Sequence, residues 1–368
     1  MIKSSKAFLY NLFLLFRYTI GTVKHYRCGV QKNFIIKKLE LLGWWLKERD
    51  FNTMYYAMGL NLKGTNSRDF IGRREFLSIR NRVETALKKH YGCAGLDYDA
   101  VCKDKFVAGT YFEANGIPCA ENLALIKDGR ILRKGAEPEG LESFPNREGR
   151  FILKHITMEA GEGIHVLEIN DKAILIDGKP ADLREMSVLL RPGIWLLQGF
   201  MQSHEAIRKV NSSALNTTRI VTMLDGGEPK YLAGFQAFAV NGESTDSWGR
   251  GSICVGIDIE RECLLEDGFY NLSIKDKSIT AKHPDTGIVF RDYHIPHLKA
   301  AAELCIKAHK LLYFNFIVGW DVAITDDGPV IIEANEKPGM NVVQCFDGGL
   351  RNRILSAAKQ IVDSGKEV

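Results

Sequence analysis

One stretch near the C-terminal end decides the fold, and it reads Gly319-Trp320-Asp321-Val322-Ala323-Ile324-Thr325-Asp326-Asp327-Gly328-Pro329-Val330-Ile331-Ile332-Glu333-Ala334-Asn335. Two apolar runs flank Asp326-Asp327-Gly328. This pattern is typical of two strands joined by a three-residue hairpin loop whose glycine takes a positive φ. A loop centred on Asp327 pairs residue 325 with 329 and 323 with 331, and it brings Asp321 directly opposite Glu333. Asn335 lies two residues beyond Glu333 and therefore shares that face of the hairpin.

Asp321 and Glu333 need a compensating charge in such a hairpin. Like charges directly opposite each other on neighbouring strands are destabilising, and an unpaired carboxylate among Val, Ala and Ile costs several kcal/mol. A hard divalent cation removes both penalties, and Mg²⁺ prefers a few oxygen ligands completed by substrate phosphates. The stretch therefore predicts a magnesium site made by Asp321, Glu333 and Asn335. The alternative is a solvated acidic hairpin with a bulge that slips the register by one residue.

Length and composition indicate a globular protein with more than one lobe. The chain has 368 residues, too many for one compact core, and its 45% hydrophobic and 26% charged residues are ordinary for a soluble protein. A net charge of +4 is too small to imply a nucleic-acid partner. The eight cysteines show no Cys-x-x-Cys pair and no zinc-type His spacing. Free thiols in a reducing cytoplasm are therefore expected.

Positive charge is concentrated at the N-terminus, where residues 1–50 carry ten Lys or Arg against three Asp or Glu. The apolar run 7–16 is too short for a bilayer span, which needs about 20 residues, and no good signal-peptide cleavage site follows it. A basic amphipathic helix within residues 1–35, bound to the inner face of a membrane, is one interpretation. The other is a helix that packs on the rest of the chain or on a second subunit of a homo-oligomer.

Helices and antiparallel hairpins are mixed along the chain. Residues 1–95 are mostly helical, with apolar residues at three- and four-residue spacing over 39–46 and 76–87. A helix over 105–115 ends at a Gly-Ile-Pro stop signal. The remaining pattern predicts helices over 183–190, 296–312 and 354–361, and strands over 123–126, 151–154, 164–169, 173–176, 195–201, 217–223, 231–240 and 252–257. This mixture favours an α+β fold over a doubly wound sheet.

Two expected strands carry cations. Lys154 ends an apolar strand, and a loop with Gly161 and Gly163 follows it. A lysine at a strand end before a glycine-bearing loop is one way to place a cation and backbone N–H groups around phosphates, although Gly-x-Gly also occurs in plain β-turns. Arg219 lies in a strand rich in β-branched residues, where arginine is rarely buried without an anionic partner. That partner is either a structural carboxylate or a substrate.

The order of these features resembles the ATP-grasp superfamily: Lys154, a glycine loop, an apolar connector strand, an Asn-Thr-x-Arg strand at 216–219, and then Asp321 and Glu333-x-Asn335. The wording of the hairpin is most similar to the branch described as sugar-transfer-associated ATP-grasp proteins, and the resemblance covers roughly residues 100–345. It implies a two-lobe α+β fold with nucleotide between the lobes. The expected parts are a helical N-terminal region over 1–95, a subdomain with the glycine loop over 96–196, and a subdomain with the metal site over 197–368.

The resemblance also implies a role for each motif residue. Lys105 and Lys154 are similar to the two lysines that reach the ATP phosphates, and the loop with Gly161 and Gly163 is similar to the one that closes over them. The connector between the lobes, whose backbone hydrogen-bonds to adenine in the family, is matched by Gln198, Gly199, Phe200 and Met201. The family's ligands of two Mg²⁺ ions are matched by Asp321, Glu333 and Asn335. Arg219 matches the arginine that steadies an acyl phosphate. Segment 246–251 is similar to a segment that lies over the acceptor side in that family. The chain departs from the family at Gln198, where relatives usually carry Glu, and at Ser247 and Arg250 in the acceptor segment, where they tend to carry Asn and Gly.

Together these features predict an ATP-dependent carboxylate–amine ligase that uses ATP and Mg²⁺ on a small-molecule carboxylate and an amine. The family's association with surface polysaccharide biosynthesis suggests a sugar acid as the carboxylate. Two alternatives stay open. One is an ATP-grasp kinase that phosphorylates a hydroxyl. The other is a non-catalytic nucleotide-binding scaffold that recruits glycosyltransferases, against which the metal residues and both lysines argue.

Overall fold

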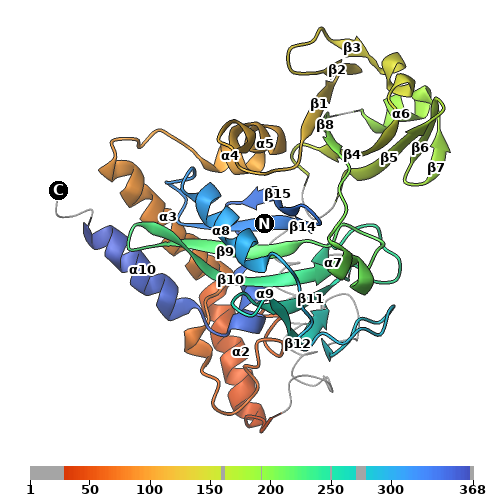
Figure 1. Ribbon diagram of the computed structural model, residues 1–368. Coiled ribbons are helices and arrows are strands. Elements are labelled where there is room, and N and C mark those ends of the chain that lie inside the picture. Colours follow the sequence, from red (N-terminus) through yellow and green to blue (C-terminus); the bar gives the residue numbers. More distant parts are fainter. Residues whose placement is uncertain (1–28, 159–161, 192, 249–250, 271–278, 365–368) are drawn as a thin grey trace, which may run out of the picture.

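The structure is a computed structural model that describes residues 29–158, 162–191, 193–248, 251–270 and 279–364. Its strands form two antiparallel sheets, and helices cover them (Figure 1). The α+β class expected from the sequence is therefore confirmed. Most of the expected helix in residues 1–35 lies outside the described residues. None of the described helices is both long and apolar enough to cross a bilayer.

The first sheet is built from residues 122–199 and has the strand order β3-β2-β1-β8-β4-β5-β6-β7. Two helices lie against it, the 3₁₀ helix η2 (Leu141–Asn146) and α6 (Leu183–Leu189). The strands are β1 (Asn122–Lys127), β2 (Arg130–Leu132), β3 (Glu139–Gly140), β4 (Gly149–His155), β5 (Ile164–Asn170), β6 (Ala173–Ile176), β7 (Lys179–Ala181) and β8 (Ile194–Gly199).

Alternation along β4 and β8 gives the first sheet two different faces. Leu153 pairs with Leu197, and both are buried in a core that includes Phe144 of η2 and Met186 of α6. The next pair, Lys154 and Leu196, points to the opposite face because successive side chains of a strand alternate. The helices therefore cover one face, and the other face presents Lys154.

The second sheet has the strand order β13-β12-β11-β10-β9-β14-β15. Its strands are β9 (Thr218–Asp225), β10 (Glu228–Phe238), β11 (Ile253–Asp258), β12 (Cys263–Tyr270), β13 (Ile279–Thr280), β14 (Ile317–Thr325) and β15 (Gly328–Asn335). The helices are α2 (Phe34–Glu48), η1 (Ser67–Asp69), α3 (Arg73–His90), α4 (Asp99–Lys103), α5 (Lys105–Ala114), α7 (Glu205–Val210), α8 (Leu298–His309), α9 (Met340–Asp347) and α10 (Arg351–Ser364).

Both faces of the second sheet are buried, as its nearly continuous apolar strands require. Val221 and Met223 of β9 pack into a core with helices α3, α9 and α10. Their neighbour Ile220 packs on the other face with Trp320 of β14 and with helices α4, α5 and α8. Within this core, the Trp320 indole N–H donates to Thr222 Oγ1, 2.8 Å away. The central strands β9 and β14 are thus held from both sides.

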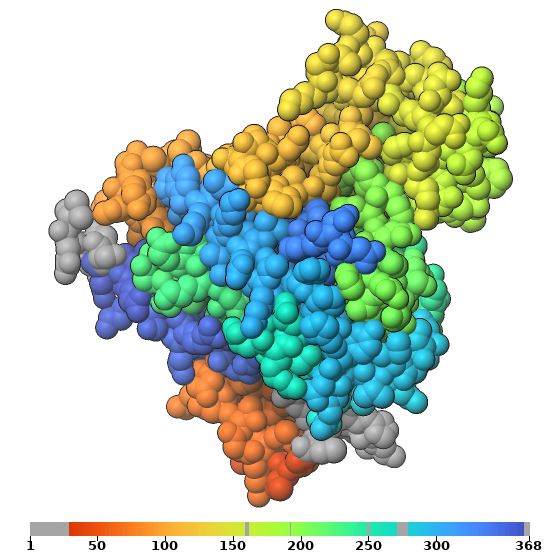
Figure 2. Space-filling view, viewed as in Figure 1, coloured from red at the N-terminus to blue at the C-terminus, as the bar shows by residue number. Residues whose placement is uncertain are grey.

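Helix α2 lies at the end of the molecule opposite the first sheet, whose lobe projects from the body (Figures 1 and 2). Its buried side includes Leu41, which joins a core with Tyr55 and with Phe269 of β12. Glu48 at its C-terminal end accepts hydrogen bonds from the backbone N–H groups of Arg74 and Glu75, at 2.7 and 3.2 Å. Glu48 therefore caps helix α3, which has no side-chain cap of its own.

The hairpin of β14 and β15 differs from the expected register. Thr325 pairs with Gly328 and Val322 with Ile331, so the expected pairings of 325 with 329 and of 323 with 331 are wrong. A bulge then leaves Ile332 unpaired, and Asp321 does pair with Glu333, as expected. The bulge compensates for a loop one residue shorter than the expected one. Gly328 has a φ of 120°, which fits a glycine at this turn.

Two further differences concern strands. Strand β8 ends at Gly199, so Phe200 and Met201 lie beyond the strand that was expected to reach residue 201. Strand β12 was not expected, because Glu266, Asp267 and Gly268 interrupt its apolar pattern. It nevertheless pairs with β11 along its length, apart from one register shift. Tertiary pairing overrides local propensity at such positions.

Candidate active site

The expected site residues meet where the uncovered face of the first sheet approaches the second sheet. Strands β4 and β8 contribute Lys154 and Gln198, strands β9, β14 and β15 contribute Arg219, Asp321 and Glu333, and helix α5 contributes Lys105. Asn335 ends strand β15. Residues far apart in the sequence are thereby brought into one charged cluster.

Asp321 is held by two neighbours on the second sheet. Arg219 faces it across β9 and β14 and donates from Nε to Oδ1 at 2.7 Å and from Nη2 to Oδ2 at 3.1 Å. Asn335 Nδ2 donates to the same Oδ2 at 3.2 Å. Burial alone lowers the pKa of Arg219, but the charge and hydrogen bonds of Asp321 outweigh it, so the pKa is raised. The anionic partner of Arg219, which the sequence left open, is therefore Asp321 in this state.

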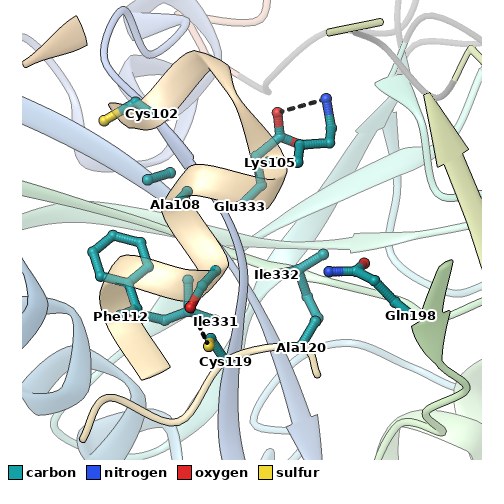
Figure 3. A pocket seen from close by; sticks show the side chains of 12 residues that line it. Cys102, Lys105, Ala108, Phe112, Cys119, Ala120, Gln198, Ile331, Ile332 and Glu333 are labelled. Carbon is teal, nitrogen blue, oxygen red and sulfur yellow. Dashed lines mark hydrogen bonds and ion pairs between the residues drawn. The ribbon is translucent and has the colours of Figure 1, made fainter. Parts of the chain in front are cut away.

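Glu333 lies opposite Asp321 but turns to a different cation. Its Oε1 is 3.6 Å from the ammonium of Lys105, which also donates to the carbonyl oxygen of Met158 at 2.7 Å (Figure 3). Burial and, next, the negative charge of Asp321 raise the pKa of Glu333, while Lys105, Lys154 and Arg219 oppose this rise. The like-charge repulsion expected from the hairpin is thus present, and the protein's own cations moderate it.

Lys154 is the buried cation of the cluster. Only 9% of its surface is exposed, and it makes no hydrogen bond or ion pair with any described residue. Burial lowers its pKa to about 8, and the nearby charges of Glu333, Asp321 and Asp246 oppose this shift. A buried ammonium without a direct partner is costly. Its position therefore favours the binding of an anion at this point.

Asp246 extends the cluster toward the acceptor segment. Its Oδ2 accepts hydrogen bonds from the backbone N–H and the hydroxyl of Thr217, both at 2.6 Å. Burial raises its pKa to about 6, the two hydrogen bonds from Thr217 oppose the rise, and the charge of Asp321 adds to it. The segment that was expected over the acceptor side thus carries a carboxylate close enough to sense Lys154 and Asp321. Gly249 and Arg250 of that segment lie outside the described residues.

Gln198 lines a narrow pocket with Lys105 and Glu333 (Figure 3). Its amide donates to Asn122 Oδ1 at 3.0 Å, and beyond it the backbone N–H of Gly199 donates to the carbonyl oxygen of Glu121 at 3.2 Å. Phe200 lies beneath the guanidinium of Arg150, 4.0 Å from the ring centroid. The pocket measures about 10 Å³, roughly the space of one water molecule. Its walls come mainly from helix α5 and strand β15.

The glycine loop is described only in part. Gly161 lies outside the described residues. Gly163 has a φ of 63°, and a Cβ there would come within 2.7 Å of Met158 Sδ and 2.9 Å of His155 Cβ. Its carbonyl oxygen accepts from the backbone N–H of His155 at 2.8 Å. Glycine is required at this turn for both conformation and space.

The structure adds two partners that the sequence did not indicate. Asn122 orients Gln198, and the Met158 carbonyl oxygen holds the Lys105 ammonium. A polar residue that opens a strand and a backbone carbonyl in a loop leave no recognisable signal in a sequence. Asn122 meets Gln198 through the pairing of β1 with β8, and Met158 meets Lys105 where the loop after β4 approaches helix α5.

A model of the family described as "Sugar-transfer associated ATP-grasp" matches residues 97–360, which is more than half of the 368 residues. None of the curated proteins compared with the chain matches it.

Several solved structures are similar at low identity. D-alanine–D-alanine ligases from Bacillus anthracis and Coxiella burnetii share 12% identity with the chain, with TM-scores of 0.40 and 0.41. The first match covers 72% of this chain and 69% of that one, and the second covers 77% and 65%. An N5-carboxyaminoimidazole ribonucleotide synthetase from Thermotoga maritima shares 14% identity at a TM-score of 0.38, with coverage of 76% and 55%. The chain spans less than two thirds of the last two proteins, and these names describe those proteins' own reactions.

Proposed function

Since this chain belongs to the sugar-transfer associated ATP-grasp family, we propose that it is an ATP-dependent carboxylate–amine ligase that works through an acyl phosphate. One observation carries the proposal: the partnerless, buried Lys154 faces the opposed carboxylates Asp321 and Glu333. Cations and paired carboxylates in one cleft are what phosphoryl transfer from a metal-bound nucleotide requires.

In the proposed reaction, a carboxylate oxygen of the acid attacks the γ-phosphorus of ATP. The bond from that phosphorus to the bridging oxygen breaks, and ADP leaves. The amine nitrogen then attacks the acyl carbon, the carbon–oxygen bond to phosphate breaks, and the nitrogen loses a proton. Lys154 and Lys105 would hold the phosphates by charge, and no covalent enzyme intermediate is needed.

Magnesium fits the oxygen donors of Asp321, Glu333 and Asn335, which would hold it. ATP-grasp enzymes use ATP and Mg²⁺, and a hard cation of this kind takes carboxylate and amide oxygens. Within the described part of the chain, no group of three or more His, Cys, Asp or Glu side chains could hold a metal ion by itself. The phosphates of ATP would therefore complete the ligand set. When bound, Mg²⁺ neutralises charge on the phosphate oxygens.

Arg219 has a double role in this proposal. Its guanidinium occupies both oxygens of Asp321, and the Asn335 amide nitrogen shares one of them. We propose that Arg219 leaves Asp321 when Asp321 binds the metal ion, and that the Asn335 amide then turns its oxygen inward. A released guanidinium can then hold the phosphate of the acyl phosphate in a two-pronged contact.

The substrates are proposed from the family's description alone. A family associated with sugar transfer suggests a sugar acid, joined to an amino acid or an amino alcohol, in the synthesis of a surface polysaccharide. The runner-up reaction on the same cleft is phosphorylation of a hydroxyl.

An oxygen-transfer experiment separates these reactions. The protein is incubated with ATP, Mg²⁺ and sugar acids labelled with ¹⁸O in the carboxylate, with and without amines, and released phosphate is analysed by mass spectrometry. A ligase that forms an acyl phosphate moves one labelled oxygen into inorganic phosphate and needs both substrates. A stable phosphorylated product with ADP and no released inorganic phosphate would instead identify a kinase, and nucleotide binding without turnover would identify a scaffold. Lys154→Met should lose turnover, whereas the exposed Lys172→Met should keep it.

A further inference from the structure

Helix α2 presents a large apolar face to solvent. The exposed α2 face is formed by Phe34, Ile35, Ile36, Leu39, Leu42 and Leu46, each with between 38% and 65% of its surface exposed. Ile35, Leu39, Leu42 and Leu46 recur at spacings of four, three and four residues, so they form one stripe along the helix. A contiguous apolar patch of this kind on a globular protein marks an interaction site.

The charges around this face are cationic, because both acidic residues of α2 point inward. Glu40 accepts hydrogen bonds from Lys32 at 2.8 Å, Tyr55 at 2.6 Å and Ser67 at 3.2 Å. Glu48 is buried and caps helix α3. Lys38 is exposed and Lys37 is half-buried, neither forms an ion pair with any described residue, and Lys38 lies 4.4 Å from the Phe34 ring centroid. The exposed α2 face is therefore apolar and is bordered by the cation of Lys38.

The apolar surface and the positive charge of the exposed α2 face together discriminate among three possible binding partners. A second copy of the chain would bring the lysines of two such helices close together. Residues 1–28 of the chain carry five Lys or Arg and no Asp or Glu, so they also repel Lys37 and Lys38. An anionic lipid surface matches both features, because apolar side chains enter the boundary of the acyl chains while lysines meet the headgroups.

We propose that the exposed α2 face docks the protein on an anionic lipid surface. Helix α2 lies at the end of the molecule away from the first sheet (Figure 1), so docking there does not bring the first sheet against the lipid surface. The proposal is independent of the reaction proposed above, since none of the cluster residues belongs to α2.

Vesicle sedimentation with the full chain tests the proposal. The protein should bind vesicles containing about one third phosphatidylglycerol, release in high salt, and not bind pure phosphatidylcholine. Lys38→Glu should weaken binding about tenfold, because it removes one lysine from the surface and adds a charge that the anionic lipid repels, each change worth roughly 1 kcal/mol. Ile35→Gln/Leu39→Gln should weaken it as well. The matched control Lys172→Glu/Lys179→Glu, on the exposed surface of the first sheet, should bind like wild type.

Three results would overturn the proposal. Equal binding to neutral and anionic vesicles would remove the electrostatic part, and wild-type binding by both α2 variants would place the lipid contact elsewhere in the chain. A dimer that dissociates in Ile35→Gln/Leu39→Gln, together with no vesicle binding, would assign the face to a second copy. Circular dichroism and thermal unfolding of each variant show that a loss of binding is not a loss of fold.

Discussion

Lys154 illustrates how a single residue can be held ready for a ligand. Burial lowers its pKa to about 8, well below that of a free lysine, so the folded protein holds this proton less tightly than the unfolded chain does. Phosphate charge nearby would favour the ammonium and raise the pKa again. Binding of a nucleotide is therefore linked to protonation of Lys154.

This linkage predicts proton uptake in alkaline solution. At pH 7 Lys154 is mostly protonated in both states, so nucleotide binding should take up little proton there. At pH 9 the free protein has largely lost the proton, so binding should take it up, and affinity should fall by up to about tenfold per pH unit above 8. Calorimetry in two buffers of different ionisation enthalpy measures the uptake.

The same shift has a consequence for stability. Between pH 8 and the usual pKa of lysine, the unfolded chain binds more protons than the folded one, so the apo protein should gain stability as pH rises through this window. Lys154→Met should abolish both the proton uptake and this gain. An unchanged pH dependence in Lys154→Met would show that another group is responsible.

Arg219→Met is expected to expose the conflict between the two carboxylates. Without its guanidinium, Asp321 and Glu333 face each other with less compensation, and the apo protein should lose about 2 kcal/mol. Mg²⁺ should then raise the melting temperature of Arg219→Met more than that of wild type, because the metal no longer competes with arginine. Thermal unfolding with and without Mg²⁺ provides the measurement.

Arg208→Met is the matched control, since it breaks an ion pair with Asp326 that is more exposed. It should cost less than about 1 kcal/mol and show no change in the response to Mg²⁺. If Arg219→Met behaved like Arg208→Met, the pairing of Arg219 with Asp321 would have no bearing on metal binding.

At the scale of elements, the β14–β15 hairpin shows how far a sequence can be read. The pairing of Asp321 with Glu333 across the hairpin was predictable, because two apolar runs joined by a glycine turn allow few strand registers. The bulge at Ile332 was not, since it depends on a turn one residue shorter than the pattern suggests. The predicted pair is correct although the predicted loop is one residue too long, because the bulge at Ile332 restores the register.

Other features also differ in whether local sequence or long-range pairing determines them. Helix α5 follows from Asp104, which accepts from the N–H groups of Phe106 and Val107, and from the glycine at its end. The partner of Arg219 could not be read, because β9 and β14 are about a hundred residues apart in the chain and are brought together only by the sheet. Local signals set the elements, whereas long-range pairing sets the site.

Glu333→Gln tests the hairpin as a unit. The pKa of Glu333 is raised by burial and by Asp321, so its ionised form is disfavoured in the fold, and the neutral amide should leave the apo protein no less stable at pH 7. Stabilisation by Mg²⁺ with ATP should shrink, and turnover should vanish. A variant that loses apo stability yet keeps the full ligand-dependent rise in melting temperature would make Glu333 a structural residue.

For the whole molecule, two connections join the lobe of the first sheet to the rest of the chain, and we expect the lobe to move when a nucleotide binds. Residues 118–121 lead from α5 into the first sheet, and residues after Gly199 lead back. Amide exchange should therefore change in these two connections when a nucleotide analogue is added, while amides in the centre of β9 stay protected in both states. Mass spectrometry of deuterium uptake reports both. Unchanged connections despite tight nucleotide binding would mean that the lobes do not separate.

The connection at 118–120 also covers the outer edge of strand β15. Strand β15 ends the second sheet, and an open sheet end is a template for pairing with another chain. Here the backbone of Ile331 donates to the carbonyl oxygen of Pro118 at 3.0 Å and accepts from the N–H of Ala120 at 2.9 Å. The chain thus shields its own strand from intermolecular addition. Damage that frees this segment, such as a proteolytic cut near residue 119, should seed aggregation as well as disable the cleft.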